Sequence, residues 1–500
     1  MREKYESLPL VQLKELAKVR GLKGTSTMKK AELVEAMLAE DERLKKEEEA
    51  KAAEQKQESA TETVRSEEPQ KQERSERPVR QERNYRPDRN YRGESAENVG
   101  VRSEAYTKER TFNPNNVAYD ESQYPKELDS GIEASGILEV MPDGYGFIRC
   151  ENYMPGENDV YVAPSQIRRF GLKTGDILKG NKRIKTQQEK FSALLFVKSI
   201  NGYTVEESSK RMAFEDMTPI FPDERIKMET PGCSIAMRVM DLVSPVGKGQ
   251  RGMIVSPPKA GKTTLLKEVA NSILRGNPKM PMLILLIDER PEEVTDIKEA
   301  IHGDNVEVIY STFDELPEHH KRVSEMVIER AKRLVEHKMD VVILLDSITR
   351  LTRAYNLVVP PSGRTLSGGL DPAALHMPKR FFGAARNMRE VGSLTILATA
   401  LVETGSKMDD VVYEEFKGTG NMEMVLDRKL SEKRIFPAID LAKSGTRRED
   451  LLLTPEELEA INIMRKALNG LKPDEATDRI LDMFAHTRNN VEFVNMVKKN

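Results

Sequence analysis

The chain has 500 residues, enough for two to four domains, and its 79 basic and 82 acidic side chains give a net charge of −3. This balance excludes a uniformly basic coat protein, so any nucleic-acid site must be a local patch. The two cysteines, Cys150 and Cys233, exclude a disulfide framework and fit a reducing compartment. No apolar run approaches the roughly 20 residues of a membrane span, and the N-terminus lacks the apolar stretch of a signal peptide. We therefore expect a cytoplasmic protein that makes no membrane contact.

The N-terminal part of the chain divides into two regions of different composition. Residues 1–40 carry two short helical patterns and predict a small helical, SAP-like subdomain. Residues 41–128 form a charged, Arg/Glu/Asn-rich insertion with few side chains for a core, so we expect it to be disordered. Two interpretations stay open: the insertion is a solvated spacer, or it is a weak RNA tether in which Tyr85 and Tyr91 stack on bases.

The rest of the chain has two further patterns. Residues 129–205 show short alternating strands separated by turn residues, which predicts a small OB-type β-barrel. Residues 206–225 form a polar connector. From 226 to 500, continuous apolar strands such as MLILLID and VVILLD alternate with helical segments, and further helices follow at the C-terminus. This order predicts a parallel sheet covered on both faces, so the fold class is α/β.

A phosphate-binding loop follows one of these strands. RGMIVS runs into PPKAGKTT and then into a helical segment, the context of a P-loop. Backbone N–H groups and the helix N-terminus offer positive partial charge, Lys262 is a point charge for the β- and γ-phosphates of ATP, and the Thr263 hydroxyl can bind Mg²⁺. Ser256 replaces the usual first glycine. The predicted nucleotide-binding residues are Lys259, Ala260, Gly261, Lys262, Thr263 and Thr264.

Two strand ends supply candidate catalytic carboxylates. VVILLD ends in Asp346, at the edge where open α/β sheets bind ligands, and we assign it to Mg²⁺ rather than to capping the next turn. MLILLID ends in Asp288-Glu289-Arg290, and Glu289 is our candidate for polarising the attacking water, with Asp288 and Glu292 as substitutes. The alternative interpretation of Glu289 is a solvated charged residue.

Two arginines and an aromatic residue late in the chain complete this site. Arg434 and Arg447 are candidates for neutralising transition-state charge, and such an arginine can come from a neighbouring subunit. The alternative for each is a surface salt bridge. Phe436 is a candidate for stacking on adenine, or else a core residue.

The predicted barrel carries an RNA-binding pattern. Tyr145, Phe147 and Arg149 alternate along DGYGFIR, so all three project from one strand face, which is typical of stacking platforms for single strands. Core packing of the aromatic residues is the alternative. We extend the patch by a second set: Tyr161, Arg168, Arg169, Glu189 and Phe191.

Two glycine-rich loops in the ATPase segment also carry basic residues. PPSGRTLSGGLDP contains Arg364 and Gly368, and ETGSKMDD contains Lys407. If subunits form a ring, these loops can point inward and grip RNA phosphates. The alternative is a pair of flexible surface loops.

Five long motifs follow the barrel in order: PPKAGKT, IDERPEEV, LLDSITRLTRAYN, EEFKGTGNMEM and KRIFPAIDLAKSGTR. With the helical segment and the DGYGFIR barrel before them, they closely resemble the Rho family of bacterial transcription termination factors. The resemblance implies a homohexameric ring of RecA-like P-loop ATPase domains, each preceded by an OB-type barrel. It implies that the ring binds nascent single-stranded RNA, translocates 5′→3′ with ATP and Mg²⁺, and dissociates the RNA polymerase elongation complex.

The resemblance also implies residue roles. Glu289 matches the catalytic glutamate, Arg290 an arginine beside the γ-phosphate, and Arg447 the arginine finger that acts across the subunit interface together with Arg434. The barrel aromatics match the primary RNA site, whereas Arg364 and Lys407 fall in the two loops of the central pore. Phe191 stands where the family has a tyrosine, so any hydroxyl contact to a base is lost.

Two other classes of protein remain as alternatives. One is a ring ATPase coupled to another task, such as the catalytic subunit of a rotary ATP synthase or a DNA recombinase. The barrel argues against the first, and stimulation by DNA alone would favour the second. The other class is an RNA chaperone that binds without turnover, against which Lys262, Glu289 and Asp346 together argue.

Overall fold

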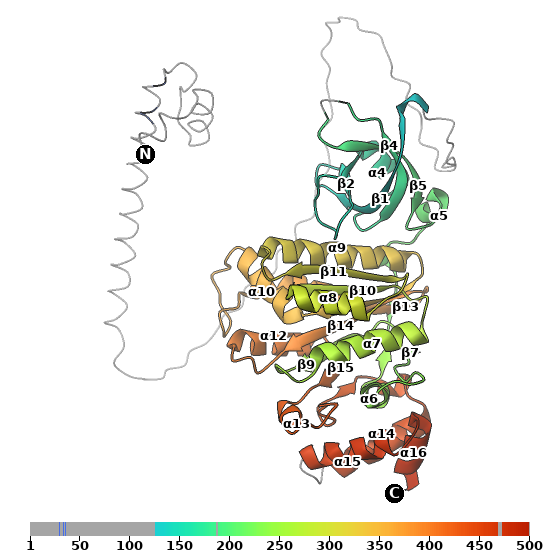
Figure 1. Cartoon of the computed structure of the whole chain (residues 1–500), viewed down its shortest axis with the longest axis vertical. Coiled ribbons are helices and arrows are strands. Elements are labelled where there is room, and N and C mark those ends of the chain that lie inside the picture. The colour runs from blue at the N-terminus through green and yellow to red at the C-terminus, as the bar shows by residue number, and fades with distance from the viewer. Residues whose placement is uncertain are drawn as a thin grey trace, which may run out of the picture. The chain divides into compact units, whose positions relative to one another are not determined.

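A computed structural model describes residues 126–186, 189–468 and 473–499, together with Lys30, Val34 and Ala36 (Figure 1). The predicted helical subdomain and the predicted disordered insertion therefore lie almost entirely outside the described residues. Within the described part of the chain, no helix is both long and apolar enough to cross a lipid bilayer.

The first described domain is a closed five-stranded barrel in the order β1-β2-β3-β5-β4. After a short 3₁₀ turn, η3 (Lys126–Leu128), its strands are β1 (Asp129–Val140), β2 (Gly146–Arg149), β3 (Val160–Val162), β4 (Ile177–Arg183) and β5 (Ser192–Ile200). Alternate apolar residues such as Leu138, Ile148 and Leu178 fill the interior, and α4 (Pro164–Phe170) packs against it through Ile167. The predicted OB-type barrel is confirmed.

The turn between β1 and β2 determines which way the side chains of the predicted RNA-binding strand point. Gly144 has a φ of +86°, a conformation that L side chains rarely adopt, and its N–H donates to the Met141 carbonyl at 2.9 Å. The turn pairs Val140 with Gly146, which fixes the register of the two strands. As a result, Phe147 and Arg149 keep the alternation that their spacing predicts.

The connector at 206–225 is more than a polar spacer. It contains α5 (Val205–Ser209), which begins one residue earlier, η4 (Phe214–Asp216), β6 (Pro219–Ile220) and the start of β7 (Arg225–Ile226). Phe214 and Met217 are buried in the core of the ATPase domain, and β6 pairs with β13 (Arg386–Met388). The connector therefore packs into the ATPase fold.

The ATPase domain is built on a sheet in the order β11-β10-β12-β14-β9-β15-β16, and the strands from β11 to β15 are parallel. The strands are β9 (Arg251–Ser256), β10 (Met282–Glu289), β11 (Val306–Thr312), β12 (Asp340–Asp346), β14 (Ser393–Leu401), β15 (Met422–Val425) and β16 (Gly445–Thr446). A separate two-stranded ribbon joins β7 to β8 (Val246–Gly247).

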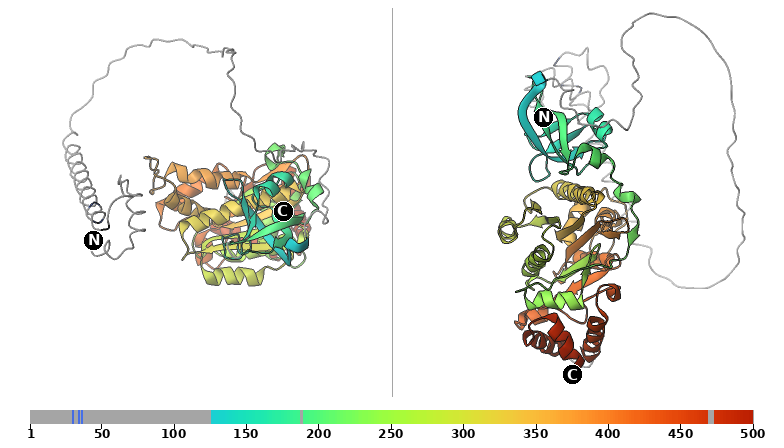
Figure 2. Two further views of the ribbon diagram at one scale, coloured as in Figure 1. Left: turned by 90° about the horizontal axis from the view of Figure 1, so that it is seen from above. Right: turned by 90° about the vertical axis from the view of Figure 1, so that its right-hand side faces the viewer.

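Helices cover both faces of this sheet, as Figures 1 and 2 show. Ile284 and Leu286 point into one core, whereas Leu283, Leu285 and Ile287 point into the other. The first core is covered by α6 (Ile235–Val243), α7 (Lys262–Gly276) and α8 (Pro291–Ala300), and the second by α9 (Pro317–Glu336), α10 (Ile348–Val358), α11 (His376–Gly383) and α12 (Lys407–Lys417). Continuous apolar strands therefore reflect burial on both sides, and the predicted α/β fold with a P-loop ATPase domain is confirmed.

Short elements and three helices complete the domain: η5 (Pro372–Leu375), α13 (Arg428–Glu432), η6 (Glu449–Leu451), α14 (Pro455–Leu468), α15 (Pro473–Ala485) and α16 (Asn490–Lys499). Thr454 and Glu457 cap α14 reciprocally, because each backbone N–H donates to the side chain of the other. Buried residues of these last helices, such as Phe493, belong to the same core as α6 and α7.

Candidate functional site

The P-loop joins β9 to α7 at the carboxyl edge of the sheet. Lys259 and Gly261 have φ values of +64° and +93°, so the loop turns back sharply before α7 begins at Lys262. The Ser431 hydroxyl donates to the Lys259 carbonyl at 2.9 Å and ties the loop to α13. Because the first N–H groups of a helix lack partners within it, the N-terminus of α7 presents donors to an anion.

Lys262 is held between the two predicted carboxylates. Its Nζ lies 3.1 Å from Oε1 of Glu289 and 2.5 Å from Oδ1 of Asp346, and both carboxylates are only 1% exposed. Burial acts to lower the pKa of Lys262, but attraction to Asp346 and Glu289 outweighs it and raises that pKa. Burial, and then repulsion from Asp346, raise the pKa of Glu289. The three residues singled out from separate motifs therefore form one charged cluster.

One carboxylate oxygen of this cluster accepts no hydrogen bond from the described residues. Oδ1 of Asp346 accepts from Lys262 and, at 2.7 Å, from the hydroxyl of Thr399 on β14. Oδ2 is buried and has no hydrogen-bond partner among the described residues. Thr263, the next residue of the P-loop, is half-buried. A buried carboxylate oxygen without a partner is costly, so this geometry suits an added cation.

Arg350 was not predicted from the sequence, yet it contacts the catalytic strand end. Its Nη2 lies 3.5 Å from Oε2 of Glu289, and its Nη1 lies 3.3 Å from Oδ2 of Asp288 and donates to the Asp288 carbonyl. Asp288 is thereby committed to an ion pair, while Glu292 is exposed on α8. Of the three acidic candidates for orienting water, Glu289 alone lies in the buried cluster. Arg350 lies in the first turn of α10, whereas its partners lie at the end of β10, so no local spacing in the sequence predicts the contact.

An apolar cleft of about 420 Å³ lies beside the P-loop. Ala260, Gly261 and Thr264 line one part of it, and Leu265 and Phe436 another. Phe436 is 53% exposed, so its ring is available to a ligand and is not a core residue.

The predicted arginines lie in three different places. Arg290 occupies the N-cap position of α8 directly after Glu289 and is exposed, with Nη1 4.0 Å from Glu293. Arg434 is exposed in the segment that follows α13, near the P-loop. Arg447 is exposed directly after β16, and its N–H donates to the Asn421 carbonyl at 2.8 Å.

The strand register separates Arg447 from the P-loop of its own chain. Thr446 pairs with Met422, and Met422 pairs with Gly252 near the start of β9. The P-loop begins beyond Ser256 at the other end of β9, about 13 Å away at ~3.3 Å per residue. Arg447 and the P-loop therefore lie at opposite ends of the same strands.

Four aromatic rings gather on the surface of the barrel. The ring of Phe147 lies 5.8 Å from Tyr145, 6.0 Å from Tyr161 and 5.1 Å from Phe191, measured between centroids. All four side chains are half-buried rather than part of the barrel core. Tyr161 comes from β3 and Phe191 precedes β5, so the barrel brings together residues that the sequence separates.

Arg149 differs from its prediction as a free cation. Its Nη2 lies 2.7 Å from Glu139, its Nη1 contacts Asp159, and only 6% of the side chain is exposed. The guanidinium lies 4.9 Å from the Phe147 ring centroid. The alternation along the strand predicted the face on which Arg149 lies. It did not predict the two carboxylates, one on β1 and one in the loop before β3, that pair with Arg149. Its charge is therefore neutralised, and it supports the Phe147 ring.

The remaining residues of the predicted barrel patch lie around its edge. Arg168 and Arg169 are exposed in the last turn of α4. Glu189 pairs with Arg183 at the end of β4. Of these predicted residues, Arg168 and Arg169 have no carboxylate partner in the part of the chain that the structure describes, whereas Glu189 is engaged within the barrel.

The two glycine-rich loops of the ATPase domain meet. Gly368 has a φ of +80°, and a Cβ there would lie 2.5 Å from the backbone nitrogen of Met408. Only glycine allows this approach to the start of α12, where Lys407 is the first residue. Arg364 and Lys407 are both exposed. The sequence predicted each loop separately, and the structure brings them together.

Comparisons with known proteins cover the same regions. Family models match at residues 4–41 (Rho termination factor, N-terminal domain), 134–206 (Rho termination factor, RNA-binding domain) and 236–446 (ATP synthase alpha/beta family, nucleotide-binding domain). A transcription termination factor Rho of Pseudomonas aeruginosa is 56% identical over 381 residues, covering 75% of this chain and 90% of that protein. One of Bacillus subtilis is 56% identical over 374 residues, covering 75% and 86%.

The chain belongs to the Rho family of transcription termination factors. As a member of this family it has an RNA-binding domain and an ATP-hydrolysing, nucleotide-binding domain. A solved ATPase of a bacterial type III secretion system is 21% identical, with a TM-score of 0.49 over 63% of this chain and 94% of that one. The rotary ATP synthase alternative is excluded, because the family matches include the RNA-binding barrel.

Proposed function

We propose that this Rho-family chain is an RNA-dependent ATPase of a homohexameric ring, which translocates 5′→3′ along nascent RNA and terminates transcription by dissociating RNA polymerase. The observation that carries the proposal is the separation of Arg447 from the P-loop along β9. A catalytic arginine at that end of the strands serves a P-loop only when a second copy supplies one of the two. In a closed ring of copies, every P-loop can receive Arg447 from a neighbouring copy.

The residues of the P-loop fit ATP with Mg²⁺. Thr263 and Asp346 would hold the ion, and the partnerless Oδ2 of Asp346 supports this assignment. When bound, Mg²⁺ neutralises charge on the β- and γ-phosphates. Among the described residues no group of three His, Cys, Asp or Glu side chains is placed to hold a metal alone, which suits an ion that arrives with a nucleotide. Phe436 would stack on adenine in the adjoining cleft.

The protein groups divide the work of phosphoryl transfer. Lys262 would move from its carboxylates to the triphosphate, which frees Glu289 to orient the attacking water. Arg350 holds the Asp288 carbonyl and lies beside Glu289, so we assign it a positioning role. Arg290 would lie near the γ-phosphate, and Arg447, with Arg434, would neutralise transition-state charge across the interface.

RNA would contact two surfaces. The aromatic cluster Tyr145, Phe147, Tyr161 and Phe191 supplies ring faces on which bases stack. Arg168 and Arg169 would meet phosphates at the edge of this patch. Arg364 and Lys407 would contact RNA in the centre of the ring, and the packing of Gly368 on α12 would make their loops move together.

The experiment is ATP hydrolysis by the purified full chain with cytosine-rich RNA, with single-stranded DNA of the same sequence, and without nucleic acid. We expect RNA to stimulate hydrolysis many-fold. Stimulation by DNA alone would support a recombinase-like ATPase instead. RNA binding without hydrolysis, in a protein whose Lys262→Ala variant behaves identically, would support a chaperone.

A further inference from the structure

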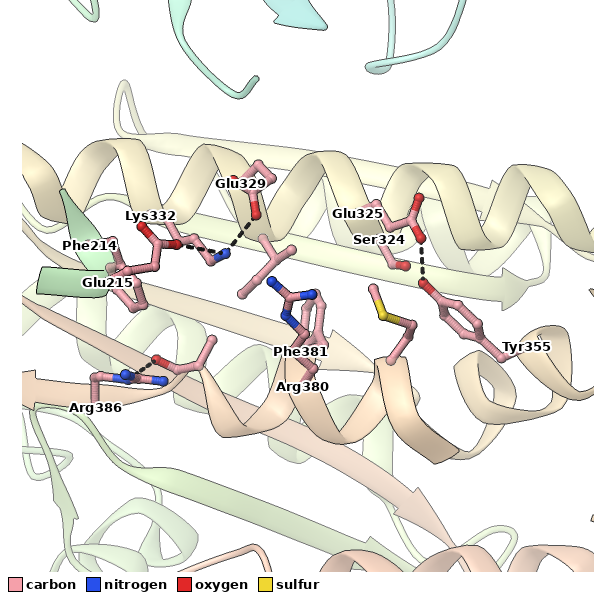
Figure 3. Close-up of a pocket in the computed structure, with 13 residues that line it drawn as sticks. Phe214, Glu215, Ser324, Glu325, Glu329, Lys332, Tyr355, Arg380, Phe381 and Arg386 are labelled. Atoms are coloured by element: carbon pink, nitrogen blue, oxygen red, sulfur yellow. Dashed lines mark hydrogen bonds and ion pairs between the residues drawn. The ribbon is translucent and has the colours of Figure 1, made fainter. Parts of the chain in front are cut away.

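A second cavity, distinct from the nucleotide cleft, lies between α9 and α11. Its volume is about 220 Å³. Phe214 and Glu215 of η4 close one end and Tyr355 of α10 lies at the other, as Figure 3 shows. This volume is below the ~300–1,000 Å³ of pockets for drug-sized ligands, so the cavity suits one small molecule.

The carboxylates that line this cavity already have partners. Glu325 accepts from the Tyr355 hydroxyl at 3.1 Å. Glu329 and Glu215 lie 2.7 and 3.5 Å from Nζ of Lys332. The acidic side chains therefore offer little to a cationic ligand.

Two arginines of the cavity, in contrast, have no carboxylate partner among the described residues. Arg380 extends from α11 into the space below α9 and is exposed (Figure 3). Arg386 donates only to the carbonyls of Ala384 and Gly383, at 3.3 Å each.

The cavity walls between these cations are apolar. Phe214 and Phe381 are 2% and 5% exposed, and Ile328 and Met377 lie beside them. The guanidinium of Arg386 lies 5.2 Å from the Phe214 ring centroid, so this ring is already fixed. A planar apolar body fits such walls, and a planar guanidinium fork prefers a carboxylate or a phosphate.

We propose that the cavity between α9 and α11 binds a small planar apolar molecule with one carboxylate or phosphate group, whose charge is held by Arg380. The site is independent of ATP and RNA binding. It contains none of the residues assigned above to the nucleotide, to catalysis or to RNA.

The test uses the full chain with the known sites filled by a non-hydrolysable ATP analogue and an oligocytidine strand. Calorimetric titrations with 1-naphthoate, 1-naphthyl phosphate and the uncharged 1-naphthylmethanol then report on this cavity. We expect one of the two anions to bind at least tenfold more tightly than the alcohol, and which anion binds distinguishes a carboxylate from a phosphate ligand.

Variants locate the binding. Arg380→Ala is expected to weaken binding of the anion at least tenfold without changing the melting temperature, because Arg380 is exposed and unpaired. Lys379→Ala, the matched control on the same helix, removes a cation that pairs with Glu415 outside the cavity and is expected to leave binding unchanged. Failure of both anions to bind, equal binding of the alcohol, or full binding by Arg380→Ala would each overturn the proposal.

Discussion

Lys262 in the ATPase domain and Arg149 in the barrel are both cations held between two carboxylates. The sequence patterns predicted each as a cation free for phosphates. Lys262 begins α7 at the carboxyl edge of a parallel sheet, where phosphates can replace its partners. Arg149 is enclosed in the barrel beside Phe147, where two carboxylates already engage its guanidinium. The same local chemistry therefore fits the proposed catalytic role of Lys262 at one place and the positioning of the Phe147 ring at the other.

A third cation sharpens this comparison because it has no carboxylate partner among the described residues. Arg447 is exposed, so its removal leaves no buried charge behind. Arg447→Ala should retain nucleotide binding and lose RNA-stimulated turnover by about 10³-fold or more, as expected for an arginine finger. Nucleotide affinity by fluorescence titration and steady-state hydrolysis separate the two effects. Loss of nucleotide affinity with normal turnover would contradict the role.

Lys262→Ala tests the ATPase side of the comparison by removing the cation between Glu289 and Asp346. Turnover should fall by about 10²–10³-fold, because a preorganised charge at the transferring phosphoryl group is lost. RNA affinity of the barrel should be unchanged, and filter binding measures it. Lys262→Arg is the control, since it keeps a positive charge between Glu289 and Asp346 but replaces the compact ammonium with a planar guanidinium. Unimpaired hydrolysis in Lys262→Ala would show that the cluster is structural.

Arg149→Ala tests the barrel side of the comparison by removing the cation beside Phe147. It leaves the buried Asp159 without its cation, while Glu139 keeps Arg322, and should destabilise the barrel by about 3–5 kcal/mol. Since Arg149 is already neutralised, the dependence of RNA affinity on salt should keep its slope. Arg169→Ala is the matched control, because this exposed arginine should reduce the slope by about one unit without loss of stability. A reduced slope in Arg149→Ala would mean that it contacts phosphate after all.

The smallest effect concerns the pH profile. Burial and Asp346 raise the pKa of Glu289, while Lys262 and Arg350 lower it. Glu289 must be ionised to orient water, so kcat/KM should fall as the pH drops through this raised pKa. Arg350→Met removes one lowering charge and should move that acidic limb to higher pH. An unmoved limb would mean that another group titrates.

The strand ends and the P-loop were predictable because they depend on local pattern. Lys262, Glu289 and Asp346 each follow or end an apolar strand, and parallel strands bring such ends to one edge. Thr399 and Arg350 were missed because their contacts depend on strand order and on helix α10. The neutralisation of Arg149 was missed because its partners, Glu139 and Asp159, come from the neighbouring strand β1 and from the loop before β3. The burial of Phe214 in the connector likewise depends on tertiary pairing of β6 with β13.

The central claim, that each ATPase site is shared between two copies, is tested most directly by mixing two inactive variants. In rings assembled from Lys262→Ala and Arg447→Ala chains, some interfaces pair an intact P-loop with an intact Arg447. The account predicts RNA-stimulated ATP hydrolysis well above that of either variant alone. Hydrolysis equal to the average of the two separate variants, in rings shown to contain both chains, would contradict it.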